Sequence, residues 1–210
     1  MNDIKAKQII EKLNSVYFGA KPALEFTSNY ELLVAVILSA QCTDERVNKV
    51  TAVLFKNYNT PEKMLTLTQE KLSKIILPCG LNNSKAKHIL DASKSIVDNF
   101  GGQVPSTLKD LQSLSGVGRK TANVVYSVAF GGDAIAVDTH VQRVSNRIGL
   151  AKSDNPLTTE KQLMKRIEKN MWSKSHHYLI YHGRRVCTAR SPKCENCVLL
   201  SLCEYKNKKV

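Results

Sequence analysis

The sequence predicts an all-α protein of two helical lobes, and three observations support this prediction. Apolar residues recur every three or four positions through most of the 210 residues, which is the spacing of one helix face. The one strand-like run, residues 134–137, is too short to supply a sheet. Composition changes most plainly at Gly131-Gly132-Asp133, so we expect the boundary between the lobes near residue 132.

Helix start and end signals place the expected elements along the chain. Apolar faces are expected over residues 4–17 and residues 45–57. A proline at the first helical position begins a helix at Pro61. Ser84 is expected to cap a helix that ends at Gly101. Further helices are expected to begin near Ser106, Lys120, Thr139, Thr159 and Ser175.

The charge of the chain favours a polyanionic partner. Thirty-one Lys and Arg residues against 18 Asp and Glu residues give a formal net charge of +13 at pH 7. Each phosphate that a basic side chain neutralises releases condensed counterions, so a nucleic acid fits an excess of this size. Solubility alone is the other explanation, and charge does not separate the two.

No part of the sequence predicts export or membrane insertion. The longest apolar run, residues 32–38, is shorter than the ~20 residues that span a bilayer. Residues 1–5 lack the apolar core of a signal peptide. We therefore expect a cytoplasmic protein, associated with the nucleoid if its partner is DNA.

Residues 106–130 are typical of a helix, a tight turn and a second helix. Gly116 and Gly118 permit backbone angles that other residues avoid, and they leave amide groups bare at the start of the second helix. Val117 between them is expected to pack into the core. Such a helix N-terminus suits a DNA phosphate. A tight corner that binds nothing is the alternative, and the net charge favours the phosphate.

The residue that follows the turn, Lys120, could act as a nucleophile. The helix dipole and burial would both oppose its positive charge and favour a neutral amine. A neutral amine could attack the anomeric carbon of a deoxyribose, displace the base and leave a Schiff base. The Schiff base acidifies the neighbouring sugar carbon, so that the 3′ phosphate leaves by β-elimination. A solvated lysine that binds phosphate is the alternative.

Four of the six cysteines crowd into the C-terminal region, as Cys187, Cys194, Cys197 and Cys203. In a reducing cytosol, clustered thiols indicate a metal site. Thiolates suit both zinc and an iron–sulfur cluster, and the spacing alone slightly favours zinc. The two other cysteines stand apart, and Cys42 is interpreted as a small hydrophobic residue.

Four segments carry more specific patterns: Leu-Ser-Ala-Gln-Cys-Thr-Asp at 38–44, the hairpin at 114–123, Ala-Val-Asp-Thr-His-Val at 136–141, and Cys-x6-Cys-x2-Cys-x5-Cys at 187–203. Together they resemble the endonuclease III family of DNA glycosylases, and the resemblance spans nearly the whole chain in order. It implies two helical lobes flanking a DNA-binding cleft, with a helix-hairpin-helix at 106–130 and a [4Fe–4S] cluster loop at 187–203. The expected domains are 22–132, and 1–21 together with 133–210.

The resemblance also assigns roles to individual residues. It implies that Lys120 is the nucleophile and that Asp138 is catalytic, although an Asp before Thr139 is more often an N-cap. Gln41 would fill the gap left by the extruded nucleotide and Leu81 would wedge the opposite strand. Residues implied in DNA contact are Gln41, Leu81, Gly116, Val117, Gly118, Arg119, Thr121, His140, Arg190 and Lys193, with Asp44 as a further lining residue of the active site.

The function that the resemblance implies is bifunctional base-excision repair. A monomer is expected because no heptad pattern or spare apolar surface stands out in the sequence. Such an enzyme removes oxidised pyrimidines from duplex DNA through a lysine Schiff base and cleaves the abasic strand 3′ to the site. One alternative is a mismatch-specific thymine glycosylase, a class that usually lacks the lysine found here at Lys120. The other is a non-enzymatic DNA-binding protein with a structural zinc site, which would be colourless.

Overall fold

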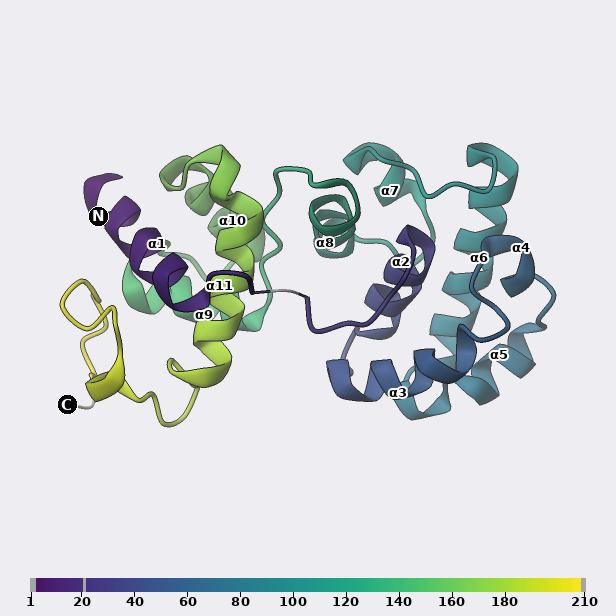
Figure 1. Ribbon diagram of the computed structural model, residues 1–210, viewed down its shortest axis with the longest axis horizontal. Helices are drawn as coiled ribbons and strands as arrows, with labels where there is room; N and C mark the ends of the chain where they lie inside the picture. The colour runs from purple at the N-terminus through teal and green to yellow at the C-terminus, as the bar shows by residue number, and fades with distance from the viewer. Residues whose placement is uncertain (1–2, 21, 209–210) are drawn as a thin grey trace. The chain divides into compact units, whose positions relative to one another are not determined.

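A computed structural model describes residues 3–20 and 22–208, and within these residues every regular element is a helix (Figure 1). The prediction of an all-α protein is therefore confirmed. The strand-like residues 134–137 are buried but form neither a helix nor a strand. None of the helices in these residues is both long and apolar enough to cross a bilayer.

The chain divides into two compact units, with a boundary between Gly131 and Gly132 and another before Pro22. Residues 22–131 are called the hairpin unit. The described residues 3–20 and 132–208 are called the terminal unit, because they lie toward the two ends of the chain. Each unit has a hydrophobic core of its own.

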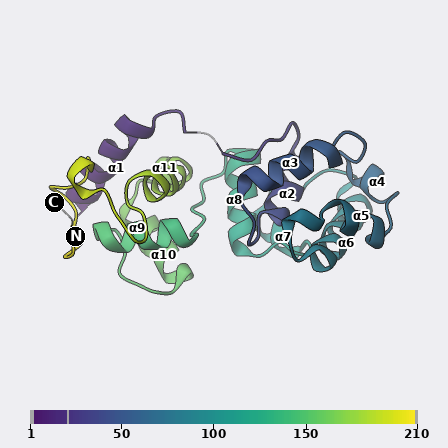
Figure 2. The same ribbon diagram turned by 90° about the horizontal axis from the view of Figure 1, so that it is seen from below.

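The hairpin unit is built around one helix that is buried on all sides (Figure 2). Residues 30–38 of α2 are all buried, and α3, α6 and α8 pack around this helix. A helix that is apolar all round belongs in a core, because no face of it gains from water. The helices of the unit are α2 (Asn29–Leu38), α3 (Asp44–Leu54), α4 (Pro61–Met64), α5 (Gln69–Ile75), α6 (Asn82–Phe100), α7 (Leu108–Ser113) and α8 (Arg119–Phe130), with a short 3₁₀ helix at Leu77–Cys79.

The terminal unit packs the first helix of the chain against the last ones. Tyr17 and Tyr178 join them through side-chain hydrogen bonds, from the Tyr17 hydroxyl to His182 Nδ1 at 3.2 Å and from the Tyr178 hydroxyl to Asn14 Oδ1 at 2.6 Å. The helices of the unit are α1 (Asp3–Tyr17), α9 (Thr139–Ile148), α10 (Pro156–Arg166) and α11 (Trp172–Arg185), with 3₁₀ helices at Lys169–Met171 and Cys194–Asn196.

Several helix starts differ from the predicted positions. The helix expected after Ser84 begins at Asn82, because the chain turns at Gly80 and Leu81, which have φ angles of 68° and 49°. The helix expected from Thr159 begins at Pro156 behind an Asn155 cap. The one expected near Ser106 is capped by Thr107, and the one expected near Ser175 begins at Trp172. Several polar residues near each start can cap, and sequence alone does not rank them.

Candidate nucleic-acid interface and catalytic residues

The hairpin turn between α7 and α8 requires glycine at only one of its two glycine positions. Gly116 has a φ of 75°, and a Cβ there would lie 2.7 Å from the Cβ of His88 on α6. Gly118 has an ordinary φ of −77° and open space around it, so the expectation that both glycines serve unusual backbone angles is wrong for Gly118. Val117 is 4% exposed and packs in the core of the unit, as the pattern predicts.

The first turn of α8 has no side-chain cap. Its N-cap is Gly118, which has no side chain to accept a hydrogen bond from the first amide groups. Arg119 and Lys120 in this turn are exposed, and Thr121 is half-buried. The helix dipole, together with the lack of a side-chain cap, makes this turn suitable for an anion.

The absence of a cap at this helix stands out within its unit. All the other α-helices of residues 22–131 except α6 begin with a Ser or Thr hydroxyl that accepts an amide hydrogen bond; these caps are Ser28, Thr43, Thr60, Thr68 and Thr107. The N-cap of α6 is Leu81, which makes no side-chain cap either. The two uncapped helices of the unit are thus those that follow the hairpin and the Leu81 turn.

Gln41 and Leu81 share an uncommon backbone conformation. Their φ angles of 53° and 49° are the positive values found for non-glycine residues in the described part of the chain. Both side chains are exposed, and Leu81 is 56% exposed although it is apolar. Such conformations cost roughly 1–3 kcal/mol each and concentrate at functional sites. The two residues that the resemblance assigns to the DNA base stack are therefore exposed side chains on turns with a strained backbone.

Asn82 and Asp44, which lie near Leu81 and Gln41 in the sequence, have structural contacts within the hairpin unit. Asn82 donates from Nδ2 to Ser73 Oγ at 2.5 Å, so its side chain fastens the turn to α5. Asp44 is the first residue of α3, follows the Thr43 cap and is half-buried. An acidic residue in the first turn complements the helix dipole, and the place of Asp44 in the lining of the active site stays a prediction.

Lys120 is exposed in the second position of α8. The expectation that burial helps to neutralise its amine is therefore not met by the folded chain alone. Its exposed amine is accessible to a large substrate such as duplex DNA.

Asp138 is the N-cap of α9. Its Oδ1 accepts a hydrogen bond from the Val141 amide at 2.7 Å, and the residue is half-buried. The capping interpretation is thus correct as a description of the local structure. The cap uses one carboxylate oxygen, which leaves the second oxygen outside this role.

His140 is fastened to α9 and α11. Its Nδ1 lies 3.2 Å from the Arg143 guanidinium, which also donates to the Gly183 carbonyl on α11 at 2.9 Å. Burial lowers the pKa of His140, and the nearby Asp138 carboxylate opposes that shift. A Cβ on Gly183 would lie 3.1 Å from the Cβ of His140, so glycine permits the close approach of the two helices. These contacts favour a packing role for His140.

The four clustered cysteines form one group of unpaired thiols. Burial raises the pKa of both Cys197 and Cys203, and the neighbouring sulfurs of Cys187 and Cys194 raise it further. The thiolates therefore repel one another, and bound cationic iron would remove that repulsion. Among the described residues, no three His, Cys, Asp or Glu side chains are grouped to hold a single metal ion.

Several N–H groups are directed at these sulfurs. The Tyr205 amide donates to Cys203 Sγ at 3.5 Å, and Arg147 donates to Cys187 Sγ at 3.6 Å. His182 Nε2 lies 3.5 Å from Cys197 Sγ, and burial lowers the pKa of His182 to about 4. Donors of this kind stabilise metal-bound thiolate, so the residues present fit an iron–sulfur cluster.

The cysteine loop is fastened to α9 by arginines. Arg147 donates to the Thr188 and Ala189 carbonyls at 2.7 and 2.8 Å, and Arg143 donates to the Cys187 carbonyl at 3.1 Å. Nothing in the sequence singles out these arginines, because basic residues on a helix usually form a solvated face. Arg190 and Lys193 on the same loop are exposed, as a contact with a DNA backbone requires.

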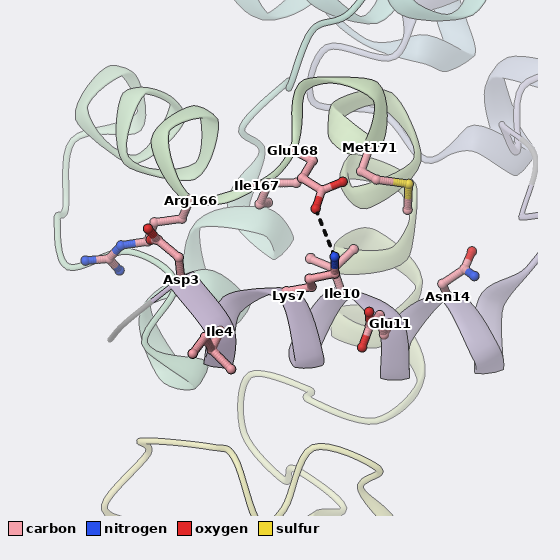
Figure 3. A pocket seen from close by; sticks show the side chains of 10 residues that line it. All are labelled: Asp3, Ile4, Lys7, Ile10, Glu11, Asn14, Arg166, Ile167, Glu168 and Met171. Atoms are coloured by element: carbon pink, nitrogen blue, oxygen red, sulfur yellow. Dashed lines mark ion pairs between the residues drawn. The ribbon is translucent and has the colours of Figure 1, made fainter.

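A pocket of about 470 Å³ lies elsewhere in the terminal unit, between α1 and the end of α10 (Figure 3). An ion pair of 3.3 Å joins Lys7 and Glu168 across it, and both side chains are mainly exposed. Ile4, which lines it, is 71% exposed. The residues lining the pocket include none of the predicted site residues, so the candidate site is not this cavity.

Comparison with known families gives two matches, which lie one after the other along the chain. Residues 34–169 match the HhH-GPD superfamily of base excision DNA repair proteins. Residues 187–203, which hold the four cysteines, match the iron–sulfur binding domain of endonuclease III.

Full-length relatives agree with these matches. The chain is 48% identical over 210 residues to endonuclease III of Bacillus subtilis (strain 168), an alignment that covers 98% of this chain and 96% of the relative. A solved structure of a trapped endonuclease III–DNA covalent intermediate, an estranged-adenine complex, matches with a TM-score of 0.93 and 45% identity, over 97% of this chain and 96% of that one. A thermostable thymine-DNA glycosylase shares the fold, with a TM-score of 0.88 at 24% identity over 97% of this chain.

Proposed function

Since the chain belongs to the endonuclease III family, we propose that it excises oxidised pyrimidines from duplex DNA and cleaves the strand 3′ to the abasic site. As a member of this family, it is a base-excision-repair DNA glycosylase and AP lyase that binds an iron–sulfur cluster through its four C-terminal cysteines. The base class and the residue roles are the part that we propose. The observation that carries the proposal is the exposed Lys120 in the uncapped first turn of α8.

Lys120 acts as the nucleophile in this proposal. Its neutral amine attacks the anomeric carbon of the damaged nucleotide, the base leaves, and the resulting imine acidifies the neighbouring carbon for β-elimination of the 3′ phosphate. DNA bound over Lys120 would supply the burial that the folded chain does not. A relative of 45% identity was captured as a covalent intermediate with DNA, which supports nucleophilic catalysis here.

Asp138 has two compatible roles in the proposal. One carboxylate oxygen caps α9 and so fixes the side chain. The other stabilises the positive charge that develops on the sugar, and assists proton transfer to and from the lysine amine. A cap of this kind restricts the carboxylate to one rotamer, which is the preorganisation that such a role needs.

The remaining contacts divide between phosphates and the base stack. The uncapped first turn of α8, with Arg119 and Thr121, binds the DNA backbone. Gln41 fills the space of the extruded nucleotide and Leu81 wedges the opposite strand. Arg190 and Lys193 add charge on the cysteine loop. Each of these side chains except the half-buried Thr121 is exposed.

The four cysteines would hold a [4Fe–4S] cluster. Cys187, Cys194, Cys197 and Cys203 supply a complete set of protein ligands in one short loop. When bound, such a cluster supplies covalent cross-links that fix the loop, and with it Arg190 and Lys193. A brown protein with broad visible absorption and iron by elemental analysis is expected. Zinc in a colourless protein would overturn this assignment.

The test is to mix the purified protein with duplex DNA that bears one thymine glycol, add borohydride, and look for a covalent adduct. We expect an adduct with the wild-type protein and with Lys109→Ala, and none with Lys120→Ala. Lys109 is a matched control because it is an exposed lysine of the same hairpin, on α7. Each variant removes one positive charge, so charge alone does not separate them.

Two results would contradict the proposal. An adduct of full yield with Lys120→Ala would remove this residue as the nucleophile. Excision of thymine from a G·T mismatch by the wild-type protein, without an adduct on thymine glycol, would assign the protein to mismatch repair instead.

The partner and the compartment follow from the substrate. The DNA of the cell is the polyanion that fits the net charge of +13, so we place the protein in the cytoplasm with the nucleoid. We propose that it acts as a monomer. Sedimentation of the free protein and of its DNA complex measures the stoichiometry directly.

A further inference from the structure

One lysine of the hairpin unit is buried. Lys85 lies in the first turn of α6 and is 3% exposed, whereas Lys87 on the same helix is exposed. The Lys85 Nζ donates to the Leu38 carbonyl and to the Cys79 carbonyl, both at 2.8 Å. No carboxylate in the part of the chain that the structure describes forms an ion pair with it. Lys85 therefore binds main-chain groups and not an acidic side chain.

Both carbonyls that Lys85 binds lie at the ends of helices. Leu38 is the last residue of α2, and Cys79 is the last residue of the 3₁₀ helix Leu77–Cys79. The last carbonyls of a helix have no partner within the helix. One nitrogen atom satisfies such a group at each of two helix ends, so the two oxygens lie no more than twice 2.8 Å apart. The end of α2 is thus joined to the 77–80 turn.

Two exposed residues on strained backbone lie close to this junction. Gln41 is three positions after Leu38, and Leu81 is two positions after Cys79. Their φ angles are 53° and 49°. Such conformations persist only where the surrounding structure holds them. Lys85 provides support of this kind near both turns.

Main-chain hydrogen bonds connect the lysine closely to both exposed residues. The Lys85 amide donates to the Leu81 carbonyl at 2.9 Å, so the lysine holds this turn through its backbone as well as its side chain. The turn that carries Gln41 is closed by the Cys42 amide, which donates to the Ser39 carbonyl at 3.1 Å. A shift of Nζ would therefore be transmitted to both turns.

A buried amine is a costly means of holding a single turn. Its transfer from water to the protein interior is unfavourable, and hydrogen bonds to carbonyls offset only part of that cost. The nearby Asn82 fastens the Leu81 turn to α5 through Ser73 Oγ without a charge. Lys85 adds the connection from this turn to the end of α2. The feature that it determines is the placement of the two turns relative to each other.

We propose that Lys85 is a positioning residue for nucleotide extrusion, which holds Gln41 and Leu81 at a fixed separation so that both enter the base stack together. The inference rests on the roles in the base stack proposed above for these two residues. Lys85 itself is buried and acts through them. A misplacement of about 1 Å can lower a rate by about 100-fold. Extrusion of the nucleotide, and not the chemistry at Lys120, is the step that should slow without Lys85.

The test measures single-turnover excision of thymine glycol by the protein with its iron–sulfur cluster in place. Lys85→Met keeps the length of the side chain and removes its N–H donors. One duplex has adenine opposite the damaged base, and a second has a stable abasic-site analogue there. The second duplex leaves the damaged base without a partner, so less energy is needed to extrude it.

We expect Lys85→Met to slow excision roughly tenfold on the paired duplex and less than about twofold on the unpaired one. The matched control is Lys87→Met, which removes an exposed lysine from the same helix and should equal the wild-type protein on both duplexes. If Lys85→Met does not fold, Lys85→Gln takes its place, because its amide keeps an N–H donor near the two carbonyls. The same difference between the duplexes is expected for it.

A second measurement shows whether the lysine acts through the two exposed residues. The double variant Gln41→Ala/Leu81→Ala should itself slow excision on the paired duplex. Adding Lys85→Met to it should slow excision by no more than about twofold further, because changes that act through one another are not additive.

The possible results separate the inference from the proposed function. Equal slowing of Lys85→Met on both duplexes would overturn the inference, since it would indicate a general loss of structure. A further tenfold loss in the protein that already lacks both exposed side chains would overturn it as well. A wild-type protein that releases thymine glycol from neither duplex would instead refute the proposed function.

Discussion

Replacing Gly116 by alanine should destabilise the protein strongly, whereas the same change at Gly118 should not. The φ of 75° at Gly116 costs an L-residue about 1–2 kcal/mol. The new Cβ would also lie 2.7 Å from the Cβ and 2.9 Å from the Cγ of His88. These atoms are the fixed base of a side chain on α6, so α6 and the hairpin must separate, at a further cost of about 1–3 kcal/mol. The sum is roughly 2–5 kcal/mol, or roughly 5–15 °C in Tm.

The matched variant Gly118→Ala should lose less than about 1 kcal/mol, because its φ is −77° and a Cβ meets nothing within 4 Å. Thermal unfolding followed by far-UV circular dichroism, at equal cluster content, measures both changes. A loss at Gly118→Ala equal to that at Gly116→Ala would refute the reasoning, since it would mean that the backbone of the turn does not distinguish its two glycines. DNA affinity, measured on the folded variants, should fall for both, because both lie beside the uncapped amides of α8.

Three further predictions concern charge and protonation. Asp138→Asn keeps an acceptor for the Val141 amide, so the free energy of unfolding should fall by less than about 1 kcal/mol. Single-turnover base excision should slow at least tenfold, and an unchanged rate would leave Asp138 as a cap only. Lys193→Ala should weaken binding equally to damaged and undamaged duplexes. It should also reduce the slope of log Kd against the logarithm of the salt concentration by about 1. An unchanged slope would place Lys193 away from the DNA. Burial, with the charge of His176 adding to it, lowers the pKa of His177 to about 4, below its unfolded value of about 6.5. Stability should therefore fall by about 1–2 kcal/mol between pH 7 and pH 5, and urea unfolding of His177→Gln should lack that part of the loss.

The fold class could be predicted because amphipathic periodicity covers most of the chain, but two features of the fold leave no such signal. Residues 30–38 of α2 are all buried, and an apolar run without alternation does not distinguish a buried helix from a buried strand. Residues 134–137 have the composition of a strand, yet they cross the core of the terminal unit with the Ala136 carbonyl bonded to His176 Nδ1 at 2.7 Å. A tertiary hydrogen bond replaces the sheet partner, and only the folded chain reveals it.

The candidate site divides in the same way. The hairpin, the Asp138 cap and the four clustered cysteines are local patterns, and a sequence displays local patterns directly. The buried Lys85 of α6 donates to the Leu38 carbonyl, 47 residues away in the sequence, so no spacing rule indicates this contact. Cys42, interpreted as a small hydrophobic residue, is half-buried and packs against the core of the hairpin unit.

The hairpin unit is less stable than it could be because of the residues proposed to contact DNA. A Ser or Thr cap contributes about 1 kcal/mol, and five helices of the unit have one, while α6 and α8 do not. Positive φ angles at Gln41 and Leu81 cost about 1 kcal/mol or more each. The total, on the order of 4 kcal/mol, is a large fraction of the stability of an ordinary domain. Packing around the buried α2 offsets this cost. Helix starts without side-chain caps and strained turns suit a surface that must bind phosphates and enter a base stack.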